Sequence, residues 1–74
     1  MIKLSITQKQ VLKVLVDNKE EFLGLEDIWK LGHVNRNHIN SAIKFFMNHD
    51  YVYQPNTEGK VMVSPDGIEL YYNS

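Results

Sequence analysis

The sequence has no cysteine and no long apolar run. The first absence excludes disulfide bonds and thiolate metal sites. A membrane-spanning helix needs about 18 consecutive apolar residues, and no stretch approaches that length. Met1–Ile6 also lacks the extended apolar segment of a signal peptide. These absences favour a reducing compartment, and we expect a cytoplasmic protein.

Groupings of catalytic residues are also missing. The glycines are isolated, at Gly24, Gly32, Gly59 and Gly67. A glycine-rich phosphate-binding loop is therefore not indicated. His33 and His38 lie five positions apart and would point about 140° apart on a helix, which does not suit a zinc site. We expect neither enzyme activity nor a metal or cofactor.

Acidic residues are absent from one window of an otherwise acidic chain. The 74 residues fit one small domain, 1–74, and carry a net charge of −1, whereas nucleic-acid-binding domains are usually basic. No acid lies between Ile28 and His49. That window contains Lys30, Arg36, Lys44 and all three histidines. A local basic strip is compatible with a specific DNA-binding protein and equally with a protein-binding surface.

The stretch 34–48 carries the strongest pattern in the chain. Its apolar residues recur at helical spacing and share one face, at Ile39, Ala42, Ile43 and Phe46. The other face carries Asn37, Asn40, Ser41, Lys44 and Asn48. Solvated helix faces more often carry Glu and Lys, whereas amides, hydroxyls and cations read base edges and phosphates. The pattern predicts a nucleic-acid-reading helix, with background composition as the alternative because the chain has seven asparagines.

The residues at the start of the chain predict an arm and a first helix. Ile2, Leu4 and Ile6 alternate with polar residues, which favours a short extended arm or, alternatively, a frayed terminus. Thr7 and Gln10 match a capping box and predict a helix over 8–17.

A short strand at 22–23 and a second helix from residue 25 to Gly32 are predicted next, with Gly32 in the usual C-terminal role of glycine. We expect Trp29 in the core, and a stacking platform is the alternative.

The residues after it predict a hairpin and a short last helix. Asn35 is placed to cap the helix over 34–48, and His49 with Asp50 closes it. Strands are expected at 51–54 and 60–63, joined by a loop in which Gly59 adopts positive φ. Ser64 and Pro65 then start a helix, which Gly67 weakens by about 1 kcal/mol relative to alanine.

This order of elements is that of a winged helix-turn-helix domain. Four segments resemble the DNA-binding core of the MarR family of bacterial regulators: Leu4-Ser5-Ile6-Thr7-Gln8-x-x-Val11-Leu12, Leu25-x-x-Ile28-Trp29-x-Leu31-Gly32, Ile39-x-x-Ala42-Ile43-x-x-Phe46 and Val61-x-Val63-Ser64-Pro65-x-Gly67-x-x-Leu70. The resemblance covers nearly the whole chain. It implies an α+β winged helix-turn-helix fold: a three-helix core with a short strand, a two-stranded β-hairpin wing and a short C-terminal helical turn.

The same resemblance implies double-stranded DNA as the partner. Helix 34–48 would enter the major groove, and hairpin 51–64 would lie along the backbone or minor groove as the wing. The residues placed at base edges or nearby phosphates are Asn35, Arg36, Asn37, Asn40 and Ser41. Lys44 would contact the backbone, and Asn56, Thr57 and Lys60 would form the wing tip.

Some residues depart from the family pattern. The turn 32–34 is one residue longer than the common spacing, and Glu58 would repel phosphate at the wing. Phe45 lies on a flank that is usually polar, where it would seat against the hairpin or contact a partner. The chain lacks the long terminal helices that build the MarR dimer and its ligand pocket, so a ligand-sensing role does not carry over.

Two functions remain open from the sequence. The first is a sequence-specific DNA-binding regulator that forms a homodimer through the Met1–Ile6 arm or the Tyr71–Tyr72 end. The second is a winged-helix protein-interaction module, an accessory factor of replication or transcription machinery. The acidic balance, the poor wing, Phe45 and the tyrosines motivate the second function.

Overall fold

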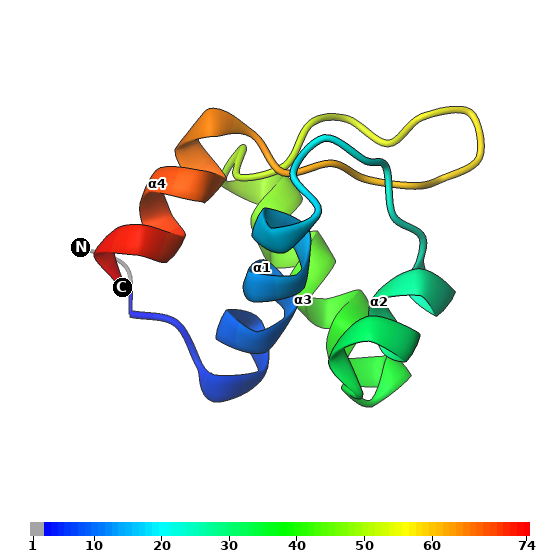
Figure 1. The fold of residues 1–74 in the computed structure, drawn as a ribbon, viewed down its shortest axis with the longest axis horizontal. Coiled ribbons are helices and arrows are strands. Elements are labelled where there is room, and N and C mark those ends of the chain that lie inside the picture. Colours follow the sequence, from blue (N-terminus) through cyan, green and yellow to red (C-terminus); the bar gives the residue numbers. More distant parts are fainter. Residues whose placement is uncertain (1–2) are drawn as a thin grey trace.

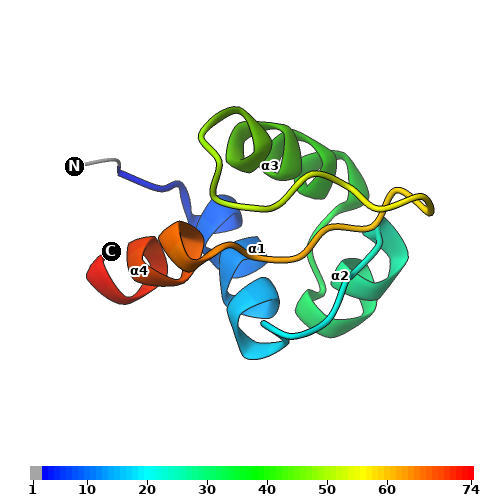
Figure 2. The same cartoon turned by 90° about the horizontal axis from the view of Figure 1, so that it is seen from above.

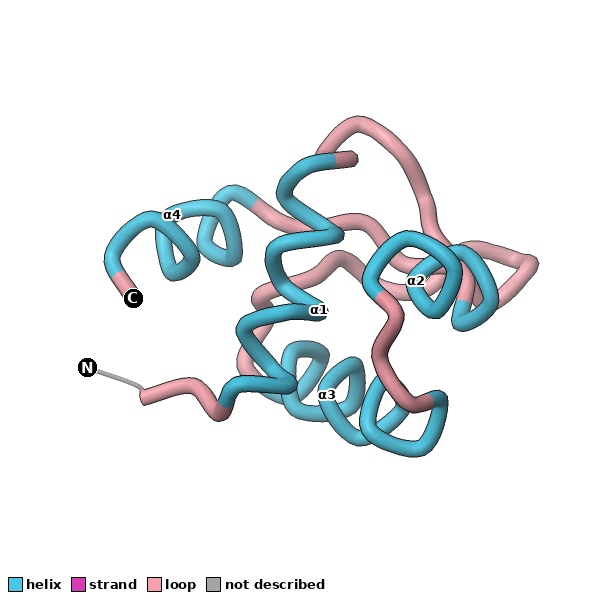
Figure 3. The backbone as a smooth tube through the Cα atoms, turned by 60° about the horizontal axis from the view of Figure 1, so that its bottom comes forward, coloured by secondary structure: helices cyan, strands magenta, loops and turns pink. Residues whose placement is uncertain are grey.

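Four α-helices make up the computed structural model, which describes residues 3–74. They are α1 (Ile6–Asp17), α2 (Leu25–Gly32), α3 (Arg36–Asn48) and α4 (Pro65–Asn73). Helix α1 packs against each of the other three, and it lies between α4 and α2 in Figure 1. Helices α2 and α3 also pack together, at the end of the molecule away from α4 (Figure 3). Within residues 3–74 no helix combines the length and apolar content needed to cross a bilayer.

The start of α1 is set by Ser5. Its Oγ accepts a hydrogen bond from the Gln8 amide at 3.1 Å, and the Gln8 side chain accepts one from the Ser5 amide at 3.0 Å. This is a capping box two residues before the predicted one at Thr7, so the helix begins at Ile6. The predicted extended arm is therefore wrong at Ile6, and Met1 and Ile2 lie outside the described residues.

The core forms where α1, α2 and α3 meet the segments beside them. Its buried apolar members are Val11, Leu12, Val14, Leu15, Val16, Leu23, Ile28, Val34, Ile39, Ala42, Phe46, Val52, Val61 and Val63. Helix α3 contributes Ile39, Ala42 and Phe46, with Ile43 half-buried beside them. The apolar face predicted for this helix is therefore confirmed. Its first turn begins at Arg36, because Asn35 is the cap and Val34 is buried in the turn before it.

The segment 51–64 runs out past α2 and returns, as Figure 2 shows in yellow to orange. It forms isolated β-bridges, Val52 with Val63 and Leu23 with Val61, and no continuous strand is present among residues 3–74. Two backbone hydrogen bonds hold its two arms together. The Tyr53 amide donates to the Met62 carbonyl (2.9 Å), and the Ser64 amide donates to the Tyr51 carbonyl (3.0 Å). The predicted two-stranded hairpin and the strand at 22–23 are thus reduced to bridges. In the hairpin, the ladder cannot extend through Pro55, which has no amide to donate.

Gly32 does not have the role predicted for it. It is the last residue of α2, and the left-handed conformation falls on His33 (φ 54°) instead. A Cβ at Gly32 would lie 2.9 Å from Cγ2 of Val14. The glycine therefore permits the close approach of α1 and α2, and the prediction of a glycine C-cap is wrong by one residue.

Helix α4 is longer and better anchored than predicted. Ser64 caps it by accepting from the Gly67 amide (3.2 Å), and its hydroxyl donates to the Asp50 carbonyl (2.9 Å). Pro65 occupies the first turn, as expected. Gly67 is buried, and a Cβ there would overlap the carbonyl oxygen of Tyr51. The short C-terminal turn predicted from the sequence is a helix of nine residues.

Candidate nucleic-acid interface

The outer face of α3 is open to solvent. Its exposed residues are Asn37, Asn40, Ser41, Lys44 and Asn48. They lie opposite the buried Ile39 and Phe46, as a helical repeat of 3.6 residues requires. No acidic residue lies in α3, so the face carries amide, hydroxyl and ammonium groups alone.

One of these groups, the Ser41 hydroxyl, already has a partner within the helix, and so does the side chain of the cap residue Asn35. The Asn35 Oδ1 caps α3 by accepting from the Asn37 amide at 2.9 Å. The Ser41 hydroxyl donates to the Asn37 carbonyl at 3.2 Å. The side chains of Asn37, Asn40 and Lys44 make no hydrogen bond or ion pair to any of residues 3–74. These three, together with the exposed Asn48, are therefore the side chains of this face without a partner among residues 3–74, and they are the best placed to bond an external one.

Arg36 is held against α2. Its Nη2 lies 2.8 Å from Oε1 of Glu26, and its guanidinium carbon lies 4.8 Å from the centre of the Trp29 ring. Trp29 is 41% exposed, so its predicted place in the core is wrong. The short α2 buries Ile28, and the next residue along a helix points about 100° away. Trp29 is a stacking platform, with Arg36 as its partner.

The tip of the 51–64 segment offers fewer free side chains for contact with DNA than predicted. The Oδ1 of Asn56 accepts from the amides of Glu58 (2.9 Å) and Lys60 (3.0 Å), which closes the turn. Gly59 has the predicted positive φ of 76°. Asn56 and Lys60 are half-buried, whereas Thr57 and the acidic Glu58 are exposed.

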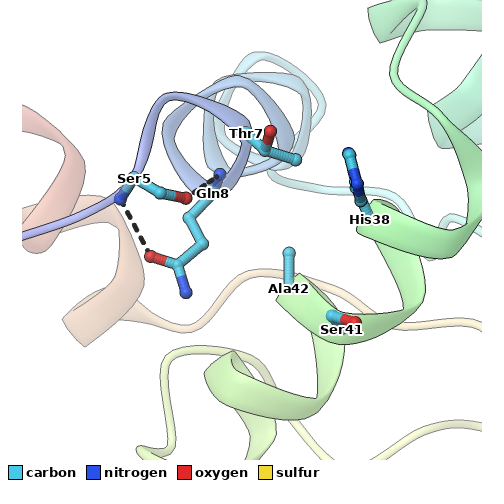
Figure 4. A pocket seen from close by; sticks show the side chains of 6 residues that line it. All are labelled: Ser5, Thr7, Gln8, His38, Ser41 and Ala42. Carbon is cyan, nitrogen blue, oxygen red and sulfur yellow. Dashed lines mark hydrogen bonds between the residues drawn. The ribbon is translucent and has the colours of Figure 1, made fainter.

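An open hollow lies beside α3, where the first turn of α1 approaches it. Its lining residues are Ser5, Thr7, Gln8, His38, Ser41 and Ala42 (Figure 4). Ser41 joins this hollow to the outer face of α3. Sequence reasoning did not single out Thr7 or His38 as site residues, because the approach of α1 to α3 is a tertiary contact.

Phe45 packs within its own chain. Its ring centre lies 5.8 Å from that of Phe46 and 4.5 Å from that of His49. The ring is half-buried and belongs to the edge of the core.

Among residues 3–74, no three His, Asp or Glu side chains gather closely enough to hold a metal ion.

Solved structures match this arrangement over almost the whole chain. BpsR of Bordetella bronchiseptica, whose DNA binding is regulated by 6-hydroxynicotinic acid, superposes on 96% of the chain with a TM-score of 0.83 and 22% identity. MepR, a transcription regulator of the Staphylococcus aureus multidrug efflux pump MepA, covers 96% with a TM-score of 0.78 and 15% identity. A Mycobacterium tuberculosis MarR family protein covers 95% with a TM-score of 0.76 and 14% identity. The chain has the winged-helix fold of the MarR family.

The winged-helix chain spans about half the length of these three proteins, 52%, 55% and 50% respectively. A scan against protein-family models finds no match, and neither does a search of curated proteins. In winged-helix terms, α2 and α3 form the helix-turn-helix, and 51–64 occupies the position of the wing. The predicted fold is therefore confirmed in its helices, while the wing lacks regular strands.

Proposed function

We propose that this winged-helix chain is a sequence-specific DNA-binding regulator. The observation that carries the proposal is the acid-free outer face of α3, on which Asn37, Asn40 and Lys44 are exposed and unpaired within the described chain. Asn side chains bond adenine through two hydrogen bonds, and Lys contacts phosphate or guanine. Among the structural neighbours, MepR is a transcription regulator and BpsR binds DNA, which supports the proposal. Helix α3 would lie in the major groove with 51–64 beside it.

The test is binding to pools of labelled duplex DNA at low and moderate salt. We expect enrichment of one sequence class and an affinity that falls as salt rises. Lys44→Ala should weaken binding to all sequences alike and lower the log–log salt slope by about 0.9, the value for one lost phosphate contact. Lys19→Ala is the matched control, because Lys19 is exposed in the acidic connection after α1.

The proposal would be contradicted if no DNA sequence were enriched and the affinity did not depend on salt. Equal losses in Lys44→Ala and Lys19→Ala would also contradict it, since the face of α3 would then have no special part. Either result would favour the protein-interaction module instead.

We further propose that the chain binds DNA as a homodimer. One module with Arg36, Lys44 and Lys60 near its interface makes few phosphate contacts, and pairing doubles them. Apolar side chains are exposed where α1 begins and α4 ends: Ile6 is 81% exposed and Tyr72 71%. Ile6 and Tyr71, the neighbour of Tyr72, line one hollow between α1 and α4. They provide a surface for self-association.

Tyr72→Glu tests this pairing. Because Tyr72 is mostly exposed, the variant should keep its fold, while the buried charge should break a dimer that forms there. We expect a dimer for the wild type and a monomer for the variant in sedimentation experiments, with Tyr53→Glu as a control on an exposed tyrosine (46%) of the wing. A wild type that stays monomeric on DNA would contradict the proposal.

A further inference from the structure

The Glu26–Arg36–Trp29 cluster joins the two helices of the helix-turn-helix. Arg36 is the first residue of α3, and Glu26 and Trp29 lie on α2. The guanidinium donates to the Glu26 carboxylate at 2.8 Å and lies over the Trp29 ring at 4.8 Å. One cation predicted to contact DNA is thus already paired with an acid of the same chain.

This pairing is open to exchange. The side chains of Arg36 and Glu26 are 52% and 62% exposed, and ion pairs of such exposure contribute little to stability. A guanidinium can bind either a phosphate or a carboxylate through the same fork of N–H donors. The Asn37 and His38 amides at the start of α3 already bond Asn35, so the helix N-terminus adds only its dipole to the field that favours an anion beside Arg36. The Glu26 carboxylate supplies the anion beside Arg36 when DNA is absent.

We propose that Glu26 competes with a DNA backbone phosphate for Arg36, so that Glu26 limits the affinity of the chain for non-specific DNA. Stacking on Trp29 keeps the guanidinium at the start of α3 while its anionic partner changes. On release, the unpaired carboxylate of Glu26 faces the phosphate backbone and opposes binding that lacks compensating base contacts. This inference rests on the proposed DNA-binding function and adds a residue that tunes it.

Trp29 reports the exchange directly. It is the single tryptophan of the chain, so its fluorescence reads the environment of this cluster alone. We expect the emission of the wild type to change on addition of a duplex of random sequence. Arg36→Gln should shift the emission of the free protein and abolish most of the DNA-induced change.

The deciding measurement is the affinity of Glu26→Gln for the same duplex. We expect binding about 1.4- to fivefold tighter than that of the wild type, the range for one exposed ion pair. Glu69→Gln is the matched control, because it removes the same charge from an exposed position on α4. The affinity of Glu69→Gln for DNA should rise by less. The Glu26→Gln/Arg36→Gln double variant should bind no more tightly than Arg36→Gln alone, because Glu26 then has no cation to withhold.

If Glu26→Gln binds DNA no better than the wild type or than Glu69→Gln, the cluster only holds α2 and α3 together and does not compete with DNA for Arg36. That result, with wild-type binding intact, overturns this inference and leaves the proposed function in place. Absence of DNA binding by the wild type and by every variant overturns both.

Discussion

Gly67→Ala is expected to lower the free energy of unfolding by about 3 kcal/mol, at the upper end of the usual cost of overpacking. Helix propensity alone predicts the opposite sign, a gain of about 1 kcal/mol in a helix interior. The structure decides between them, because an added Cβ would overlap the Tyr51 carbonyl oxygen and lie 2.7 Å from Cγ2 of Val63. Backbone atoms cannot rotate away as a flexible side chain can. Helix α4 would have to separate from the base of the wing.

Urea denaturation followed by circular dichroism measures this loss. Glu69→Ala is the control in the same helix, and its exposed position should keep the change within about 0.5 kcal/mol. A Gly67→Ala variant as stable as the wild type would show that α4 does not approach Tyr51 so closely.

Phe46→Ala is expected to cost about 3–5 kcal/mol, whereas Phe45→Ala should cost about 1–2 kcal/mol. The two residues are adjacent and chemically identical, so the difference isolates burial. Phe46 is fully buried, and Phe45 is half-buried at the edge of the core. The larger loss is comparable to the whole stability of a small domain, about 5 kcal/mol at the low end. A loss of that size leaves about 0–2 kcal/mol, so up to about half of the Phe46→Ala molecules should be unfolded at room temperature.

Thermal unfolding of both variants, side by side, gives the comparison. Similar melting temperatures for the two would contradict the assignment of Phe46 to the core and Phe45 to its edge. Phe45→Ala has a second use, because its fold should survive. Normal DNA binding by that variant would separate the regulator from the protein-interaction module, for which Phe45 was the predicted contact.

Periodic patterns could be read from the sequence because they depend on helix geometry alone. The spacing of Ile39, Ala42 and Phe46 fixes which side of α3 is buried, so the opposite side follows. Cap residues were less certain. Ser5 with Gln8 and Thr7 with Gln10 both satisfy the same capping-box pattern, and the structure uses the first pair.

Features that depend on distant residues could not be predicted. Gly32 and Gly67 match local rules for helix ends and helix breakers, yet each is needed because another segment approaches it, Val14 in one case and Tyr51 in the other. The positions of the predicted site residues on α3 follow from its period. The pairing of Arg36 with α2 could not be predicted, because it joins residues ten positions apart across a turn.

The hydroxyl of Ser64 links the two ends of the wing segment. It accepts from the Gly67 amide in the first turn of α4 and donates to the carbonyl of Asp50, two residues after α3. A rotation of the two helices relative to each other would break the bond to Asp50, so this bond ties the start of α4 to the end of α3. A dimer assembled through α4 would hold its two reading helices at one separation and orientation, and it would tolerate little variation in the number of base pairs between half-sites.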